Sequence, residues 1–312
     1  MEEAVCTFHE YRARPPAFRW KKGGLRFFIT LSVFAVICTS MGVPAETVLF
    51  VGNSLIYGAR SPVKRYGADT VTDLNDAGFG GVPALFKAFT RQVGLDYDVS
   101  LEAAGGTGLD FHYIEQLSRL DRKWDHVVLS GNSLLDAQRP GDPAMSLKYA
   151  GLLAEVFRRR NPDVKVWLNA TWSRADQTYL KDGHWYGKPI SAMANDIRAA
   201  CDLAATSSRA IKGVIPVGQA WTRAMEMGVA DSNPYDGLTF GKVDLWAYDQ
   251  YHASTHGYYL EALVIFGMIT GQDPRVLGDR SKAADDLGIS PAHAKALQGV
   301  AHEELVALAA GS

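Results

Sequence analysis

Two short stretches, far apart in the chain, carry a serine, an aspartate and a histidine whose types and spacing could do chemistry. Ser54 stands in VLFVGNSLIYG, directly after an apolar run that is typical of a buried strand. Asp249 precedes His252 by three residues in YDQYHASTHG, so within a turn the carboxylate can hold one imidazole nitrogen and leave the other free. A free imidazole nitrogen can accept the proton of a serine hydroxyl. The three residues therefore predict acyl transfer, with Ser54 as nucleophile, His252 as base and Asp249 as the group that orients the base.

Donors for a developing oxyanion are available at three strand ends. EAAGGTG places Gly105 and Gly106 where a backbone N–H can approach a ligand closely. SGNS places the side-chain amide of Asn132 at the tip of another strand, and the N–H of Ser54 is a further donor. Removing one such donor costs about 3 kcal/mol of transition-state stabilisation, so an acyl-transfer site needs them.

The elements that must position these residues alternate between strand and helix. Strands are expected at 47–51, 97–102, 126–130, 164–169 and 213–217. Helices are expected at 83–93, 111–120, 146–160, 189–207, 219–228 and 257–270, and a last one runs from Pro291, after Ser290 as N-cap, to about Leu308. This alternation predicts an α/β fold, a flavodoxin-like three-layer α/β/α sandwich with a five-stranded parallel sheet, whose C-terminal strand edge carries the site.

Two long connections, 59–81 and 171–188, should lie at the same edge as Ser54, and loops of this length in a compact domain are usually functional. The second contains aromatic residues among polar ones, which either bind a sugar ring or pack the loop against the domain: Trp172, Tyr179, Trp185 and Tyr186. The first contains cations that either meet an anionic group or are solvated: Arg60, Lys64 and Arg65.

The first 45 residues have the features of a secretory signal, namely a basic flank, an apolar segment and a small-x-small ending at Ala45. We expect a signal peptide at 1–45 with cleavage near Ala45, and hence an exported protein, periplasmic or secreted; an uncleaved membrane anchor is the alternative. Residues 46–312 then form a single catalytic domain that includes the C-terminal helix.

Charge and cysteine content exclude several classes of protein. Removing residues 1–45 takes away six of the 32 basic and three of the 34 acidic residues, which leaves a net charge of −5. A nucleic-acid-binding protein would need a basic face, so no nucleic-acid partner is expected. Only Cys201 of the three cysteines remains, so no internal disulfide can form. The sequence has no P-loop and no Cys/His zinc cluster, and we expect neither a metal nor a cofactor.

Four blocks, in order, resemble those of the SGNH, or GDSL-type, hydrolases. GNSLIYG resembles the first block GDSLTxG, GGTG the second, SGNS the third (GxND), and DQYHASTHG the last (DxxHPxxxG). The resemblance runs from about Val48 to Gly271. It departs from the family pattern at Asn53, Ser133 and Ala253, where the family usually has Asp, Asp and Pro.

The resemblance implies the same roles for the residues that match. Ser54 would be the nucleophile, His252 the base and Asp249 its partner. The oxyanion donors would be Ser54, Asn132 and Gly106, or else Gly105. His256 is the one rival base, and an ordinary α/β-hydrolase is disfavoured because GNSLI lacks the second glycine of the G-x-S-x-G elbow.

These features together predict an exported serine esterase that forms an acyl-enzyme on Ser54 and cleaves a short acyl ester, with acetyl on a carbohydrate favoured. Its partner would be a small-molecule or polysaccharide ester, with membrane contact only through an uncleaved leader. Candidate substrate-binding residues are Asn53, Trp172, Trp185 and Tyr186. One alternative is a non-catalytic carbohydrate- or envelope-binding module, which the departures at Asn53 and Ser133 keep open. A lipase or thioesterase with the same triad is the other.

Overall fold

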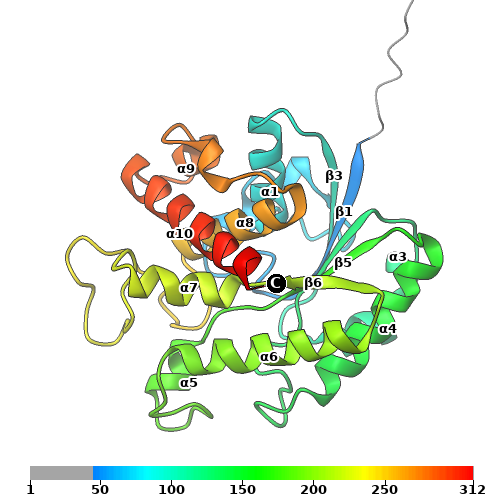
Figure 1. Cartoon of the computed structure of the whole chain (residues 1–312), viewed down its shortest axis with the longest axis horizontal. Coiled ribbons are helices and arrows are strands. Elements are labelled where there is room, and N and C mark those ends of the chain that lie inside the picture. Colours follow the sequence, from blue (N-terminus) through cyan, green and yellow to red (C-terminus); the bar gives the residue numbers. More distant parts are fainter. Residues whose placement is uncertain (1–44, 312) are drawn as a thin grey trace, which may run out of the picture. The chain divides into compact units, whose positions relative to one another are not determined.

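A parallel β-sheet lies between two layers of helices in the computed structural model, which describes residues 45–311 (Figure 1). The six strands have the order β2-β3-β1-β4-β5-β6. Their bounds are β1 Glu46–Gly52, β2 Thr72–Asp73, β3 Tyr97–Ala103, β4 His126–Leu129, β5 Lys165–Asn169 and β6 Ile211–Ile215. Without β2, the order is the 2-1-3-4-5 pattern of flavodoxin-like folds. The predicted α/β sandwich is confirmed, and the predicted number of five strands is wrong.

The strand that sequence analysis missed is β2, at the edge of the sheet. It pairs only Thr72 and Asp73 with Ser100 and Leu101 of β3. Two residues are too few to show an alternating pattern, so nothing in the sequence marks them as a strand.

Strand β1 lies at the centre of the sheet and is buried on both faces. Val48 and Phe50 pack into one layer of the core, and Leu49 and Val51 pack into the other; all four side chains are fully buried. Side chains of a strand alternate between its faces, so one continuous apolar run supplies both layers. The end of this strand therefore has a fixed position, and Ser54 follows directly after it.

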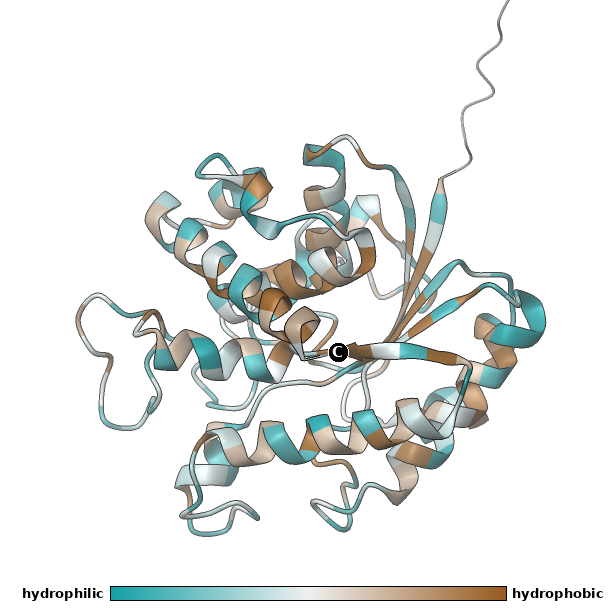
Figure 2. Ribbon diagram, viewed as in Figure 1, coloured by the Kyte–Doolittle hydropathy of each residue, from teal (hydrophilic) through white to brown (hydrophobic). Residues whose placement is uncertain are grey.

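The helices divide between the two faces of the sheet (Figure 1). One face is covered by α1 Gly81–Gln92, α7 Val217–Glu226 and α8 Thr255–Thr270, and α10 Pro291–Ala310 packs against α8. The other face is covered by α2 Leu109–Glu115, α4 Ala144–Arg160 and α6 Ser191–Ser207. Helix α8 is apolar almost all round because its neighbours cover it, whereas α4 and α6 are apolar on one side (Figure 2). The final helix begins as predicted, since Ser290 Oγ accepts a hydrogen bond from the N–H of His293 at 3.2 Å.

Short helices fill the connections. They are α3 Leu117–Leu120, α5 Ala175–Tyr179 and α9 Lys282–Asp286, and the 3-10 turns η1 Pro62–Arg65, η2 Ala68–Thr70 and η3 Pro274–Leu277. Among the helices of residues 45–311, none combines the length and apolar character that a bilayer crossing requires. The signal segment predicted at 1–45 lies, apart from Ala45, outside the described residues.

Candidate active site

Ser54 and His252 line one open cavity of about 860 Å³. It lies at the C-terminal ends of the central strands, where β1 has β3 on one side and β4 on the other. The strands that follow β1 in the chain lie first on one side of it (β2 and β3) and then on the other (β4 to β6), and open α/β sheets bind their ligands at such a reversal of strand order. The other lining residues are Tyr57, Ala59, Arg60, Ser61, Pro62, Lys64, Gly105, Gly106, Tyr248 and Tyr251.

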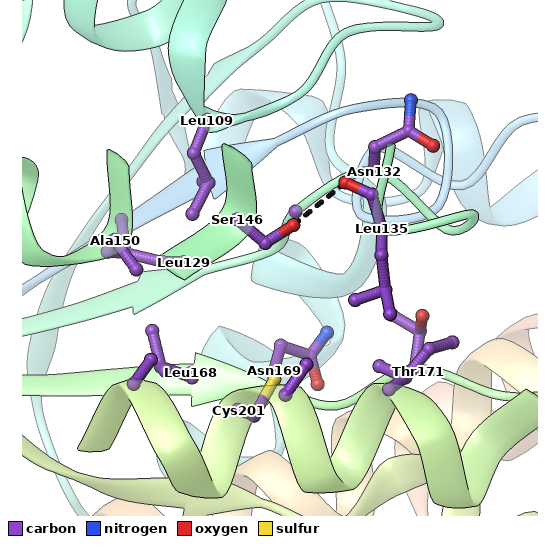
Figure 3. A pocket seen from close by; sticks show the side chains of 14 residues that line it. Leu109, Leu129, Asn132, Leu135, Ser146, Ala150, Leu168, Asn169, Thr171 and Cys201 are labelled. Atoms are coloured by element: carbon purple, nitrogen blue, oxygen red, sulfur yellow. Dashed lines mark hydrogen bonds between the residues drawn. The ribbon is translucent and has the colours of Figure 1, made fainter. Parts of the chain in front are cut away.

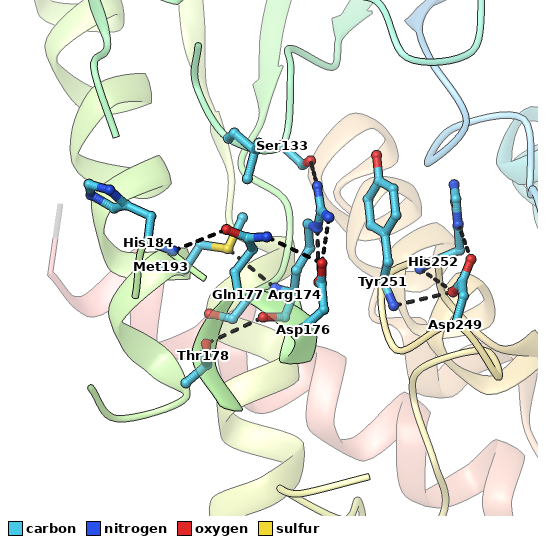
Figure 4. Close-up of polar contacts among 12 residues, drawn as sticks. Ser133, Arg174, Asp176, Gln177, Thr178, His184, Met193, Asp249, Tyr251 and His252 are labelled. Carbon is cyan, nitrogen blue, oxygen red and sulfur yellow. Dashed lines mark hydrogen bonds and ion pairs between the residues drawn. The ribbon is translucent and has the colours of Figure 1, made fainter. Parts of the chain in front are cut away.

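Asp249 holds His252 in a fixed orientation (Figure 4). Its Oδ2 lies 2.7 Å from Nδ1 of His252, and its Oδ1 accepts hydrogen bonds from the N–H groups of His252 at 2.9 Å and Tyr251 at 3.2 Å. Burial favours the neutral acid, but these hydrogen bonds outweigh it, and the pKa of Asp249 is lowered from its ordinary value. An ionised Asp249 places the imidazole proton on Nδ1. The opposite nitrogen, Nε2, is buried and has no hydrogen-bond partner within residues 45–311.

The Ser54 loop is fixed by a close approach of two strands and by a buried tyrosine. A Cβ on Gly52 would lie 2.8 Å from Cβ of Ser130, so only glycine fits at the end of β1. Tyr258 on α8, the helix that follows the His252 loop, donates its hydroxyl to the carbonyls of Ser54 at 3.2 Å and Ala59 at 3.0 Å. This hydroxyl links the two loops that carry the nucleophile and the base. Sequence analysis missed Tyr258, which stood inside an apolar helical pattern.

No hydrogen bond joins Oγ of Ser54 to Nε2 of His252 in the described part of the chain. Hydrogen bonds between catalytic groups are often long before substrate binds and tighten in the complex. Residue Ser54 is 6% exposed and residue His252 is 8% exposed, so both reach the cavity from an otherwise buried position.

Three of the predicted oxyanion donors lie beside this cavity. Gly105 and Gly106 line it together with Ser54, and Gly106 has a φ of 77°, which favours glycine. A Cβ on Gly105 would lie 2.9 Å from the hydroxyl of Tyr57, so a larger residue there would displace this side chain. Asn132 lines a neighbouring cavity of about 540 Å³, which meets the first at Gly106.

Asn132 is oriented by its own turn. Its Oδ1 accepts a hydrogen bond from the N–H of Leu134 at 2.9 Å, which leaves the Nδ2 group without a partner in residues 45–311. The amide points away from a small apolar cavity of about 30 Å³ formed by Leu129, Leu168 and their neighbours (Figure 3). A donor that is free and lies next to Gly106 suits the role predicted for Asn132.

Asn53 has a structural position, and the substrate-binding role that the sequence suggested for it is not supported. Its Nδ2 donates to the carbonyls of Thr107 and Gly131, both at 3.0 Å, and its Oδ1 accepts from the N–H of Leu55 at 3.1 Å. The residue is 4% exposed. Asn53 therefore ties the ends of β3 and β4 to the nucleophile loop and has no group left for a ligand.

A second acid–imidazole pair lies beneath the glycine loop, and sequence analysis left it unassigned. Nδ1 of His112 contacts Oε2 of Glu102, and both side chains are fully buried. Nε2 of His112 lies 3.3 Å from Oγ1 of Thr107, whose hydroxyl donates to the carbonyl of Ala104 at 2.7 Å. Oε1 of Glu102 accepts from Asn75 Nδ2 at 3.2 Å. The pair supports the loop 104–108, which carries the candidate oxyanion glycines.

The predicted aromatic substrate residues do not line the cavity of Ser54. Trp172 and Trp185 are fully buried, which contradicts a role for either at the rim of the site. Trp172 stacks on Trp221 with ring centroids 4.5 Å apart, and its Nε1 donates to the carbonyl of Tyr251 at 3.1 Å. The loop 171–188 thus packs against the His252 loop and supports it. Tyr186 is 50% exposed and is not one of the residues that line the cavity.

Arg174 contributes to the same support. Its guanidinium lies 3.6 Å from the ring centroid of Tyr251, and its Nη2 pairs with Asp176 at 2.6 Å (Figure 4). The ring of Tyr251 in turn lies 4.1 Å from that of His252. A stack of arginine, tyrosine and histidine fixes one side of the imidazole.

His256, the rival base, has other surroundings. It lies on α8 with its ring 5.3 Å from that of His293 on α10, and it does not line the cavity of Ser54. Burial, followed by the neighbouring His293, lowers the pKa of His256 to about 4. No group of metal-ligating side chains large enough to hold an ion occurs within residues 45–311.

Comparison with solved structures shows what this chain is similar to. A DUF4886 family protein from Bacteroides uniformis matches with 21% identity over 84% of this chain and 95% of its own, at a TM-score of 0.56. TesA matches with 14% identity over 72% and 99% of the two chains, at 0.48. A member of the lipolytic G-D-S-L family from Veillonella parvula matches with 14% identity over 73% and 100%, at 0.46. At these identities the likeness concerns the fold alone.

No family model matches the chain, and neither does any curated protein. The strand order places the four sequence blocks at the C-terminal edge of the sheet, where open α/β sheets bind their ligands, and the protein shares its fold with the DUF4886 family protein.

Proposed function

We propose that this protein is a serine hydrolase that cleaves carboxylic esters through an acyl-enzyme on Ser54. The observation that supports this most is that Ser54 and His252 line one cavity, while Asp249 holds Nδ1 of His252 at 2.7 Å. The buried, unpartnered Nε2 needs an explanation, because buried polar atoms are nearly always hydrogen-bonded. Accepting the serine proton provides it.

The reaction follows from these positions. Oγ of Ser54 attacks the ester carbonyl carbon while its proton moves to Nε2 of His252, and Asp249 stabilises the imidazolium. The N–H groups of Ser54 and Gly106 and the amide of Asn132 receive the oxyanion. The intermediate collapses, the C–O bond breaks, and the leaving alcohol takes the proton from Nε2. Water then attacks the acyl carbon and gives its proton to Nε2, the bond between that carbon and Oγ of Ser54 breaks, and Oγ takes the proton back from Nε2 as the acid leaves.

We further propose that the acyl group is short. Of the two cavities that Asn132 lines, the apolar one has a volume of only about 30 Å³. An acetyl group needs little apolar space, whereas a fatty acyl chain needs a long tunnel. The lining of the Ser54 cavity is mostly polar or aromatic, which also favours a polar alcohol such as a sugar over a lipid. Export by the leader at 1–45 belongs to the same proposal.

Labelling with a fluorophosphonate and hydrolysis of p-nitrophenyl acetate test the proposal. The wild type should be labelled once and should hydrolyse the ester, and Ser54→Ala should lose both. Ser61→Ala is the matched control, since Ser61 lines the same cavity, and this variant should still be labelled. A wild type that is not labelled would favour the non-catalytic binding module. Full activity in Ser54→Ala would overturn the assignment of the nucleophile.

A further inference from the structure

The cavity that holds Ser54 has a one-sided charge. The lining residues from the described range 45–311 include two cations, Arg60 and Lys64, and no aspartate or glutamate. The chain as a whole carries a net charge of −2, so this local excess of positive charge does not reflect a basic protein. A cleft lined by one sign of charge raises the local concentration of ligands of the opposite sign.

Lys64 is a partly buried cation without an anionic partner. Its ammonium lies 4.9 Å from the ring centroid of Phe79 and 5.5 Å from that of Tyr57. No carboxylate of residues 45–311 lies within 4.0 Å of it. The backbone that carries it is fixed, because Gly58 has a φ of 80° and a Cβ there would lie 2.8 Å from N of Lys64. The charge is therefore held at the cavity wall and is not neutralised there.

Arg60 is the second cation, and most of its donors are free. Its only ion pair within residues 45–311 is from Nε to Oδ2 of Asp249 at 3.6 Å, a distance beyond a good hydrogen bond. Asp249 is already satisfied by His252 and by two backbone N–H groups. The guanidinium lies 5.7 Å from the ring centroid of Tyr248, and its side chain is 56% exposed. Its two terminal nitrogens remain available to an incoming anion.

Neighbouring Arg65, in the same segment, is a cation whose guanidinium already has hydrogen-bond partners. Its Nη1 donates to the carbonyls of Ala77 and Gly78, both at 2.7 Å, and it is not one of the cavity-lining residues. Two of the three cations that the sequence singled out therefore reach the cavity, and the third serves to fold the loop.

We propose that the substrate is an acylated acidic sugar whose carboxylate lies next to Lys64 and Arg60; this rests on the proposed esterase function. The cations bind the carboxylate. Among the tyrosines on the same lining, the exposed Tyr248 offers a ring face to a pyranose, and Tyr57 and Tyr251, whose rings are stacked on other side chains, offer their hydroxyls. The negative charge belongs to the alcohol part of the ester, since the acyl part is short and faces the oxyanion donors.

Binding to the Ser54→Ala variant tests the anion site without requiring turnover. Calorimetry should show tetragalacturonate binding at least about tenfold more tightly than cellotetraose at 50 mM salt, and the difference should shrink at 500 mM. Adding Lys64→Met should abolish the difference, whereas Lys181→Met, which removes the same charge from an exposed position away from the cavity lining, should preserve it. Equal affinity for the two oligosaccharides, or a preference that Lys64→Met does not change, would overturn the proposal.

Kinetic measurements test whether the negative charge that the site prefers lies in the alcohol part or in the acyl part of the ester. 4-Acetoxybenzoate should show a lower KM than its neutral methyl ester, and Lys64→Met and Arg60→Gln should each reduce that advantage. A preference for mono(4-nitrophenyl) succinate over 4-nitrophenyl butyrate would instead place the charge in the acyl part and contradict the proposal. Failure of the fluorophosphonate to label Ser54 would remove the esterase but would leave the calorimetric result as an independent outcome.

Discussion

Two of the acid–imidazole pairs in the protein, His252 with Asp249 and His112 with Glu102, have different environments. In the first, Asp249 holds Nδ1 of His252, the opposite nitrogen has no partner within residues 45–311, and His252 lines the cavity of Ser54. In the second, Glu102 contacts Nδ1 of His112, and the opposite nitrogen faces a threonine hydroxyl in a fully buried site. The pairs have the same chemical types and nearly the same pairwise contact.

The hydrogen bonds at Nε2 of the two histidines show why only His252 can accept a proton there. The Thr107 hydroxyl has one proton and donates it to the carbonyl of Ala104, so its contact with Nε2 of His112 requires a proton on that nitrogen. Nε2 carries its proton whether the second proton, the one between Nδ1 and Glu102, lies on the ring or on the carboxylate. His112 is thus a donor at Nε2, whereas His252 is an acceptor there. The atom that faces the distal nitrogen decides the function of each pair.

Replacing His252 by alanine should produce the largest effect on activity. Loss of the only base in the cavity should lower kcat for p-nitrophenyl acetate by about 10⁴-fold or more, because the serine proton then has no acceptor. Stopped assays over a range of enzyme concentrations can measure the residual rate. The thermal midpoint should change little, since His252 is held at the surface of the cavity. Activity within tenfold of wild type would show that His252 is not the base.

Asp249→Asn tests the difference between the two histidines more directly. It should lower kcat by about 10³- to 10⁴-fold, somewhat less than the loss of His252. The amide oxygen can still accept the N–H groups of Tyr251 and His252, so the loop keeps its shape. The amide can donate to Nδ1, which places the imidazole proton on Nε2 and makes His252 resemble His112. Steady-state kinetics at several pH values measure the loss, and a kcat close to wild type would contradict the role of Asp249.

The first pair could be found in the sequence and the second could not. Asp249 and His252 are three residues apart, so a single turn brings them together and the spacing alone indicates it. Glu102 ends a strand and His112 lies in a helix ten residues later, and only the packing of α2 against the sheet joins them. Long-range side-chain contacts of this kind leave no periodic signal in a sequence.

The difference between local and long-range contacts also explains which other predictions failed. Strands β1 and β3–β6 were found because each is an apolar run with turn residues after it. The aromatic loop 171–188 appeared to suit a sugar because its tryptophans stand among polar residues. The structure buries Trp172 against Trp221, which lies 49 positions later, and a sequence pattern does not show a stack between such distant residues. Composition indicated aromatic rings in the loop but not the side on which they lie.

Breaking the second pair should affect folding more than chemistry. His112→Leu leaves the Glu102 carboxylate buried without its partner and should cost about 3–5 kcal/mol in the free energy of unfolding. Urea unfolding measures this, with the exposed His184→Leu as control, for which a change within about 0.5 kcal/mol is expected.

The double variant Glu102→Leu/His112→Leu tests whether the cost comes from the unpaired charge. It should be less destabilised than the sum of the two single variants, since it leaves no buried charge without a partner. If the two single effects simply add, the buried pair is not an energetic unit.

Another fully buried carboxylate, Glu261 on α8, has no imidazole partner within residues 45–311 and should make the stability of the fold depend on pH. Asn169 donates to its Oε1 at 2.7 Å, and its Oε2 has no partner within residues 45–311. Burial raises the pKa of Glu261 from 4.5 to about 8, with the hydrogen bond from Asn169 opposing the shift. Between these two pH values the folded state binds the proton that the unfolded state has released, so stability falls as the pH rises.

Glu261→Gln should remove this pH dependence. Relative to the variant, the wild type should lose up to about 1.4 kcal/mol per pH unit between pH 4.5 and 8, and the difference should become constant above that range. Urea unfolding of both proteins at pH 5, 6.5 and 8 measures the loss. A difference that does not vary with pH would show that Glu261 is ionised in the folded protein. In that case the hydrogen bond from Asn169 alone would be enough to keep a buried carboxylate ionised, without an imidazole partner.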